Sequence, residues 1–222
     1  MDGREDSPPA EEAHRPADWE NFRVETISAA TFVKRNVIHW DLIRAVLKRA
    51  RGGGVLEVGV GSGAQSALLS RWVRPVVTID NDRRIMEAAG PNLRRFGPRT
   101  TRVLADAFRM PFRDRAYGVS LSQGLMEHFD DDGIAGLVRE QLRVCRSVVF
   151  SIPSDRYPRQ DVGNERLMPP ERWRAIVERA AGPGYAVKAR YYRGDLEALK
   201  YSVLARRWLG SFSVLVSVDP AA

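Results

Sequence analysis

The chain has 222 residues, of which 35 are Lys or Arg and 28 are Asp or Glu, so its formal net charge is +7 and its pI is about 10.0. A hydrophobic content of 44% and a charged content of 28% are typical of a globular protein, and the length fits one large domain. No apolar run approaches the roughly 18 residues of a membrane span, and the acidic start lacks the apolar stretch of a signal peptide. The single cysteine, Cys145, excludes an intramolecular disulfide. These features predict a cytoplasmic protein without a membrane segment.

The charge is distributed unevenly along the chain. Residues 1–20 carry −5, so the remaining 202 residues carry +12, and 31 of the 35 basic residues are arginine. A basic surface can attract nucleic acid or anionic substrates. The arginines are scattered rather than massed in one block, however, so a compositional preference for arginine explains them as well. A nucleic-acid partner is therefore an alternative and not the favoured interpretation.

Residues 1–17 are rich in Pro, Glu and Ala without an apolar period, which predicts a disordered acidic tail. Residues 18–222 are expected to form one domain. Within it, apolar residues between 18 and 51 recur at three- and four-residue spacings, which predicts an N-terminal helical cap. Gly52-Gly53-Gly54 ends this helical pattern.

Short apolar runs then alternate with longer amphipathic ones. The apolar runs predict strands at 55–60, 75–80, 101–106, 117–122 and 147–153, and helical patterns cover 63–73, 82–96 and 131–145. Strands separated by helices of this length indicate βαβ units and a parallel sheet. Near-continuous runs of Val, Leu and Ile indicate that helices cover both faces of that sheet.

The end of the chain has a different pattern. Residues 170–181 predict a helix, and 185–192 and 211–218 alternate in the way of antiparallel strands. Between them, 195–210 predicts another helix with a stripe of Leu and aromatic residues. That stripe is expected in the core or in a subunit interface, so the protein is expected to be a monomer or a homodimer.

Three glycines occupy the junction between the first strand and the first helix after it. Gly59, Gly61 and Gly63 permit a tight turn and let a ligand approach the backbone. With Ala64, the first two also satisfy G-x-G-x-x-A, the dinucleotide fingerprint. Taken alone, this turn does not distinguish a nucleotide from other ligands, or from a turn that needs glycine for structural reasons.

Two acidic residues narrow the class of ligand. Asp80 ends the second strand, 21 positions after Gly59, where a carboxylate can accept hydrogen bonds from ribose hydroxyls. Glu57 lies within the first strand, two positions before the first glycine. Its charge would repel a pyrophosphate but could pair with an ammonium group. The residues therefore indicate a ligand with a ribose and a cation and without phosphate.

At this point the sequence resembles the class I S-adenosylmethionine-dependent methyltransferases, particularly the small type-11-like group. The matching segments are LEVGVGSG (56–63), VVTIDND (76–82), VLADAFRMPF (103–112), YGVSLSQGLMEHFDD (117–131) and RSVVFSIPS (146–154). The resemblance implies a Rossmann-like α/β fold, a mainly parallel seven-stranded sheet with an antiparallel C-terminal strand and helices on both faces. It also implies a cofactor-binding half at 52–153 and a substrate-side half at 154–222, after the cap at 18–51.

The resemblance further implies which residues hold S-adenosylmethionine and its product S-adenosylhomocysteine. Glu57 would hold the methionine amino group, Gly59, Gly61 and Gly63 would let the backbone approach, and Asp80 would bind the ribose with Asn81 beside the adenine. Asp106 would accept from the adenine amine, and Ala107 and Phe108 would line the base pocket. Gln123 would lie near the sulfonium.

The reaction itself demands little of the protein, because a sulfonium is already an activated electrophile and positioning supplies much of the catalysis. Where the acceptor carries a proton, His128 is the candidate catalytic base, since it lies just beyond the fourth strand and its ordinary pKa is about 6.5. His128 could instead pack against or cap the next helix, which Asp130-Asp131-Asp132 begins. No metal site is expected.

The acceptor is less well defined by the sequence. Trp19, Phe22 and Phe32 could form a lid, and Arg156, Tyr157 and Arg159 in the loop after the fifth strand could hold an anionic or carbonyl-bearing substrate. A small-molecule acceptor, methylated at O, N or C, is the favoured hypothesis. The alternatives are an RNA or protein methyltransferase and a catalytically inactive cofactor-binding regulator. A nicotinamide-dependent oxidoreductase is disfavoured by Glu57.

Overall fold

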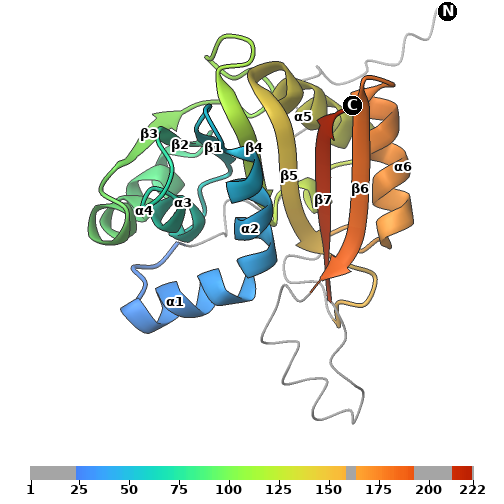
Figure 1. The fold of residues 1–222 in the computed structure, drawn as a ribbon. Helices are drawn as coiled ribbons and strands as arrows, with labels where there is room; N and C mark the ends of the chain where they lie inside the picture. The colour runs from blue at the N-terminus through green and yellow to red at the C-terminus, as the bar shows by residue number, and fades with distance from the viewer. Residues whose placement is uncertain (1–23, 159–163, 193–211, 222) are drawn as a thin grey trace, which may run out of the picture.

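The structure is a computed structural model that describes residues 24–158, 164–192 and 212–221. The acidic tail predicted at 1–17 and the helix predicted at 195–210 lie outside these residues. Within them, a seven-stranded sheet has the order β3-β2-β1-β4-β5-β7-β6, with helices on both of its faces (Figure 1). No helix in the described part of the chain has the length and apolar composition to cross a bilayer.

The first half of the sheet follows the predicted βαβ pattern. The chain passes through β1 (Val55–Val58), α3 (Ala64–Leu69), β2 (Val76–Asp80), α4 (Arg83–Phe96) and β3 (Thr100–Leu104). Both strand pairs are parallel, with Glu57 beside Thr78 and Asp80 beside Leu104. Helix α3 ends earlier than its apolar pattern suggests, because the backbone after Leu69 turns through bonds from Arg71 and Trp72 to the carbonyls of Leu68 and Leu69.

The second half continues from the other side of β1. It contains β4 (Tyr117–Gln123), the short 3₁₀ helix η2 (Met126–His128), α5 (Asp131–Val144), β5 (Cys145–Pro153), α6 (Pro170–Ala181), β6 (Tyr185–Tyr192) and β7 (Ser213–Pro220). Strand β7 runs antiparallel to both of its neighbours, β5 and β6. The mainly parallel sheet with an antiparallel C-terminal strand is therefore confirmed.

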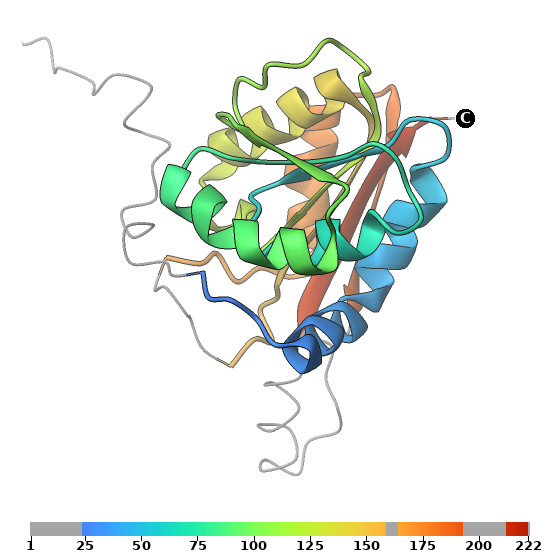
Figure 2. The same ribbon diagram turned by 90° about the vertical axis from the view of Figure 1, so that its left-hand side faces the viewer.

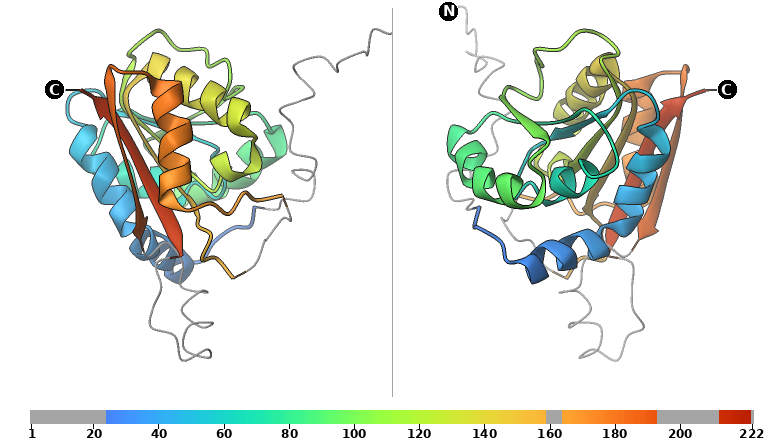
Figure 3. Two further views of the ribbon diagram at one scale, coloured as in Figure 1. Left: turned by 90° about the vertical axis from the view of Figure 1, so that its right-hand side faces the viewer. Right: turned by 60° about the vertical axis from the view of Figure 1, so that its left-hand side comes forward.

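Two buried layers enclose the sheet. On one face, Leu42, Ile43 and Val46 of α2 (Trp40–Arg49) pack on the central strands, and α3 and α4 lie beside them. On the other face, α5 and α6 cover β4, β5, β6 and β7, with Trp173 and Phe150 in edge-to-face contact at the centre. Figures 2 and 3 show these helical layers on the two sides of the sheet.

The predicted N-terminal cap is two helices rather than one. Helix α1 (Ala29–Ile38) begins at the N-cap Ser28, whose side chain accepts from the Thr31 amide, so the helix starts well after Trp19. His39, with φ −92° and ψ 24°, separates α1 from α2. The apolar period runs through this break because both helices bury one face, so it does not reveal the change of direction.

Candidate cofactor-binding site

The candidate site lies at the carboxyl ends of β1, β2 and β4. Strand β1 is central, with β2 on one side and β4 on the other, so the strand order reverses at this point. In open parallel sheets such a reversal leaves a crevice outside the carboxyl ends of the strands, and ligands bind there. The sheet therefore brings the predicted segments 57–63, 80–81 and 123–128 to one edge.

The glycine-rich turn has a backbone that requires glycine. Gly59, Gly61 and Gly63 have φ values of 79°, 47° and 73°, in the left-handed region that other residues rarely adopt. A Cβ added at Gly61 would have no atom of the surrounding described residues within 4 Å, so the backbone there is open on the described side. A Cβ at Gly63 would lie 2.8 Å from Leu93 Cδ2, which shows that this glycine also lets α3 and α4 approach closely.

Glu57 is a buried carboxylate at the base of this turn. Its side chain is 2% exposed, and Oε2 accepts a hydrogen bond of 3.1 Å from Thr78 Oγ1 on β2. Burial raises the pKa of Glu57 to about 7, although the bond from Thr78 opposes this shift. A cation placed at this carboxylate would offset the cost of burying its charge. Thr78 was not among the predicted site residues, since a threonine within an apolar strand carries no signal of its own.

Asp80 links β2 to the glycine-rich turn. Its Oδ2 accepts from the amide of Val60 at 3.1 Å, and its Oδ1 accepts from the amide of Asp82 at 3.0 Å. Burial raises the pKa of Asp80, and these backbone bonds lower it. Asn81 follows on the exposed side. The carboxylate that the sequence assigns to a ribose is thus held in place by the turn that it borders.

The third predicted segment follows β3. Asp106 is exposed and accepts from the amide of Phe108 at 2.9 Å. Ala107 and Phe108 are half-buried, and the Phe108 ring meets the Phe129 ring edge-to-face at 5.5 Å. An exposed acid beside a partly covered aromatic ring can offer both an acceptor and an apolar surface to a flat base.

Gln123 and His128 lie at and just beyond the carboxyl end of β4, at the same edge of the sheet. Gln123 is the exposed last residue of β4, and Gly124 follows with a φ of 67°. His128 ends η2, and its Nδ1 lies 2.7 Å from Oδ1 of Asn164. The sequence offers no signal for Asn164, because it lies between β5 and α6 in a segment that matches no helix, strand or motif pattern.

Hydrogen bonds from Arg166 hold the segment after position 163 against the loop that carries His128. The amide of Arg166 donates to the Glu127 carbonyl at 2.8 Å, and its guanidinium reaches Phe129 O at 3.1 Å and Asp131 Oδ1 at 2.7 Å. Glu127 is 3% exposed, its Oε2 has no hydrogen-bond partner among the described residues, and burial raises its pKa to about 8. A buried acid therefore directly precedes the candidate base in the sequence.

Other predicted residues take different positions. Phe32 is buried against Phe96 in a stacked pair at 4.4 Å and does not line an open lid, while Trp19, Phe22 and Arg159 lie outside the described residues. Arg156 stacks over the ring of Tyr191 at 3.6 Å, and Tyr157 is half-buried. Asp130 caps α5 by accepting from Gly133 at 2.7 Å, as its place before the helix predicted.

These groups match the chemistry of S-adenosylmethionine. The buried Glu57 can pair with an ammonium group, and the carboxylate of Asp80, held by backbone amides, can accept from a ribose diol. The open backbone of the glycine-rich turn leaves room for a ligand without phosphate. No cluster of three or more His, Cys, Asp or Glu side chains that could hold a metal ion occurs among the residues with described positions.

Comparison with known proteins finds a related family. The methyltransferase domain family matches residues 55–147. Protein-L-isoaspartate O-methyltransferase 2 of Rhodopseudomonas palustris is 28% identical over 130 residues, which are 54% of this chain and 59% of that protein. The match thus spans about three-fifths of the length of that curated relative.

Solved structures share the fold at low sequence identity. A SAM-dependent methyltransferase from Aquifex aeolicus aligns with a TM-score of 0.60 and 16% identity, covering 87% of this chain and 98% of that one. The phosphoethanolamine N-methyltransferase 1 of Haemonchus contortus, in complex with phosphoethanolamine and S-adenosylhomocysteine, aligns with a TM-score of 0.63 and 12% identity, covering 86% and 44%. The match of residues 55–147 to the methyltransferase domain family and the shared fold together support a class I S-adenosylmethionine-dependent methyltransferase.

Proposed function

We propose that the protein transfers a methyl group from S-adenosylmethionine to O, N or C of a small-molecule acceptor. The observation that carries this proposal is the meeting of Glu57, the glycine-rich turn and Asp80 at the point where the strand order reverses. When bound, the cofactor supplies a methyl group on a positively charged sulfur, which leaves as a neutral thioether.

In this proposal the chain's own residues bind and orient. Glu57 holds the ammonium group, Asp80 the ribose diol, and the backbone at Gly59, Gly61 and Gly63 lies along the ligand. Asn81, Asp106, Ala107 and Phe108 surround the adenine, and Gln123 borders the transferred methyl group. Since the electrophile is already activated, holding the acceptor in line contributes most to the rate.

His128 is proposed as the base for acceptors that carry a proton. Its Nδ1 lies at hydrogen-bond distance from Asn164 Oδ1, an atom that can only accept, so Nδ1 carries the proton of the neutral ring. The lone pair is then on Nε2, which would take the proton of the acceptor. Asn164 is a positioning residue in this scheme, because it sets both the tautomer and the ring direction.

Calorimetry tests the cofactor assignment. S-adenosylhomocysteine should bind with micromolar or tighter affinity, NADH should not, and Asp80→Ala should weaken the former. Binding of NADH without S-adenosylhomocysteine would contradict the proposal.

Turnover tests the catalytic assignment. In a screen of acceptors with [methyl-³H]S-adenosylmethionine, His128→Ala should lower kcat roughly 10²- to 10⁴-fold while calorimetric affinity for S-adenosylhomocysteine is kept. Unchanged turnover in this variant would assign His128 to packing. Binding without turnover of any acceptor would favour a catalytically inactive regulator.

A protein acceptor is the second candidate, because the matched curated relatives are named protein-L-isoaspartate O-methyltransferases. An isoaspartyl peptide in the same screen, with its aspartyl isomer as control, separates the two. Methylation of the isoaspartyl peptide alone would replace the small-molecule proposal.

A further inference from the structure

The arginines that are scattered in the sequence gather at the edge of the sheet opposite the candidate site. An exposed arginine precedes each of the first four strands: Arg51 before β1, Arg74 before β2, Arg99 before β3, and Arg113 and Arg115 before β4. Because β3, β2, β1 and β4 are neighbours and parallel, their amino ends lie side by side. With strands about 4.8 Å apart, these arginines follow an edge of about 15 Å. We refer to them, with Arg146, as the basic edge.

Arg146, the second residue of β5, extends the basic edge past β4. Its guanidinium donates to the carbonyl of Arg51 at 3.2 Å, and it lies so close to Gly53 that an added Cβ there would be 2.8 Å from its NH2 atom. The Arg146 side chain and the Arg51 carbonyl come from positions 95 residues apart in the sequence. Their approach is a consequence of the strand order alone.

The acidic residues near this edge are already used by other arginines. Asp114 and Glu140 both bind Arg143, and Asp219 binds Arg49 through two guanidinium nitrogens. Among the residues that the structure describes, no member of the basic edge forms an ion pair. Because Asp114 and Glu140 share one arginine, they leave one negative charge near the six arginines of the basic edge, which therefore keeps a net positive charge.

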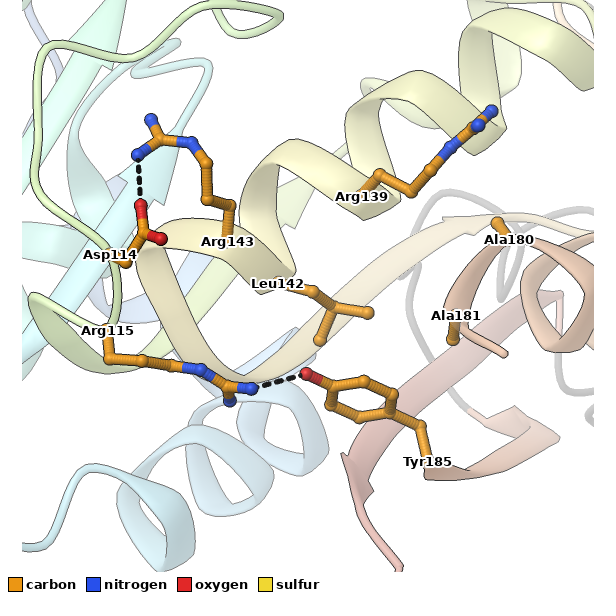
Figure 4. A pocket seen from close by; sticks show the side chains of 8 residues that line it. All are labelled: Asp114, Arg115, Arg139, Leu142, Arg143, Ala180, Ala181 and Tyr185. Atoms are coloured by element: carbon orange, nitrogen blue, oxygen red, sulfur yellow. Dashed lines mark hydrogen bonds and ion pairs between the residues drawn. The ribbon is translucent and has the colours of Figure 1, made fainter. Parts of the chain in front are cut away.

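A shallow hollow of about 340 Å³ continues the edge between α5, α6 and the start of β6 (Figure 4). Arg115 reaches across it to the hydroxyl of Tyr185 at 2.8 Å. Arg139, one turn of α5 before Arg143, points away from Asp114. Arg115 itself has a φ of 54°, a left-handed backbone that is uncommon outside glycine.

A tryptophan accompanies the arginines. Trp72 is 58% exposed and lies between Arg71 and Arg74, in the turn that enters β2. Its amide donates to Leu69 O at 3.0 Å, so the backbone beneath the ring is fixed. An exposed large aromatic ring beside arginines that form no ion pair with any described residue offers a stacking surface next to phosphate-binding groups.

Helix polarity does not account for this arrangement. Basic residues favour the last turn of a helix, which explains Lys48 and Arg49 in α2 or Arg94 and Arg95 in α4. The arginines that precede the four strands lie outside the helices. Among the described residues, Arg115 is the one arginine of this set whose guanidinium forms a hydrogen bond, to Tyr185.

We propose that the basic edge binds single-stranded nucleic acid, with arginines on successive phosphates and Trp72 stacked on a base. Planar guanidinium groups bind phosphate oxygens in pairs, which suits arginine better than lysine. This surface is separate from the proposed catalytic edge, so it provides a partner-binding face and does not depend on the methyl acceptor.

Fluorescence anisotropy with a 5′-fluorescein-labelled 20-mer of uridine tests the proposal on the full chain. Each contact to a single-stranded phosphate adds about −0.7 to the slope of log affinity against log salt. Four contacts predict a slope near −3, and so a loss of affinity of about 50-fold between 50 and 200 mM NaCl.

Charge-reversal variants locate the surface. Arg74→Glu with Arg99→Glu should weaken binding and bring the slope to about −1.4, since two contacts are lost. Lys34→Glu with Arg35→Glu is the matched control: it changes the net charge equally on exposed positions of α1, a helix whose Phe32 packs beside Val60 at the other edge. Equal weakening by both double variants would overturn the assignment to the basic edge.

Trp72→Ala distinguishes nucleic acid from other polyanions. It should weaken binding of the uridine 20-mer about fivefold or more without changing the salt slope, because stacking is uncharged. Thermal unfolding of each variant confirms that it is folded. No binding at 50 mM NaCl, or binding of phosphatidylglycerol vesicles without binding of the oligonucleotide, would overturn the proposal.

Discussion

The protonation of Glu57 is the residue-scale property that most directly tests the cofactor site. Its pKa of about 7 means that the free protein carries a proton there at pH 6 and has largely lost it at pH 8. An ammonium group binds the ionised carboxylate, so below pH 7 that proton must leave before binding. Affinity for S-adenosylhomocysteine should therefore rise from pH 6 to pH 8.

Glu57→Gln removes this dependence. The variant should bind roughly 10-fold or more weakly at pH 8, in line with the loss of a hydrogen bond to a charged group. Calorimetry at pH 7 in two buffers of different ionisation enthalpy measures the released proton. An identical observed enthalpy in both buffers for the unmodified chain would contradict this role.

Glu127 predicts a second effect of pH, on stability rather than on binding. The folded chain keeps the Glu127 proton up to about pH 8, whereas the unfolded chain loses it near 4.5. The folded state thus binds more protons between these values, and the free energy of unfolding falls as pH rises through them, by on the order of a few kcal/mol.

Glu127→Gln should therefore raise the midpoint of thermal unfolding at pH 8 and change it little at pH 4.5. Glu87→Gln, on the exposed face of α4, is the control that should shift neither. If Glu127→Gln shifted the midpoint of thermal unfolding by the same amount at pH 8 and at pH 4.5, Glu127 would not be a buried acid that stays protonated.

At the scale of elements, two glycines that each precede a strand differ in what surrounds them. A Cβ on Gly97, between α4 and β3, would lie 2.3 Å from the Cα of Ala67 in α3, which is backbone and cannot move aside. Gly184, before β6, has no atom within 4 Å of an added Cβ. Gly97→Ala should destabilise the fold by roughly 1–3 kcal/mol. Gly184→Ala should change stability by less than about 0.5 kcal/mol, as denaturant titration can measure.

The predicted elements differ in how well their ends follow from the sequence. Helix α6 covers 170–181 as predicted, because Pro170 and Gly182 bracket it. The break at His39 has no such marker. It depends on packing, since His39 turns its ring toward Tyr192 on β6, 153 residues away.

At the scale of the whole molecule, a buried hydrogen-bond network joins three distant segments. Tyr192 OH lies 3.0 Å from His39 Nδ1 and also bonds Ser151 Oγ, which ties the junction of α1 and α2 to β5 and β6. Tyr192→Phe keeps the ring and should cost about 1–2 kcal/mol of unfolding free energy. Tyr185→Phe, at the other end of β6 with an exposed bond to Arg115, should cost less than half as much. Equal losses of unfolding free energy in the two variants would show that burying the hydrogen bonds of Tyr192 adds no stability.

The sequence by itself determined the order of the strands and helices and the parallel character of the sheet, and it indicated the proposed cofactor residues from Glu57 to Gln123. Those features are local: apolar period, glycine turns and short motifs are written in consecutive residues. The tertiary structure decided what depends on contacts between distant positions. It brought Thr78 to Glu57, Asn164 to His128 and Tyr192 to His39. It also gathered arginines from five separate segments at one edge, because parallel strands place all of their entering loops on the same side of the sheet.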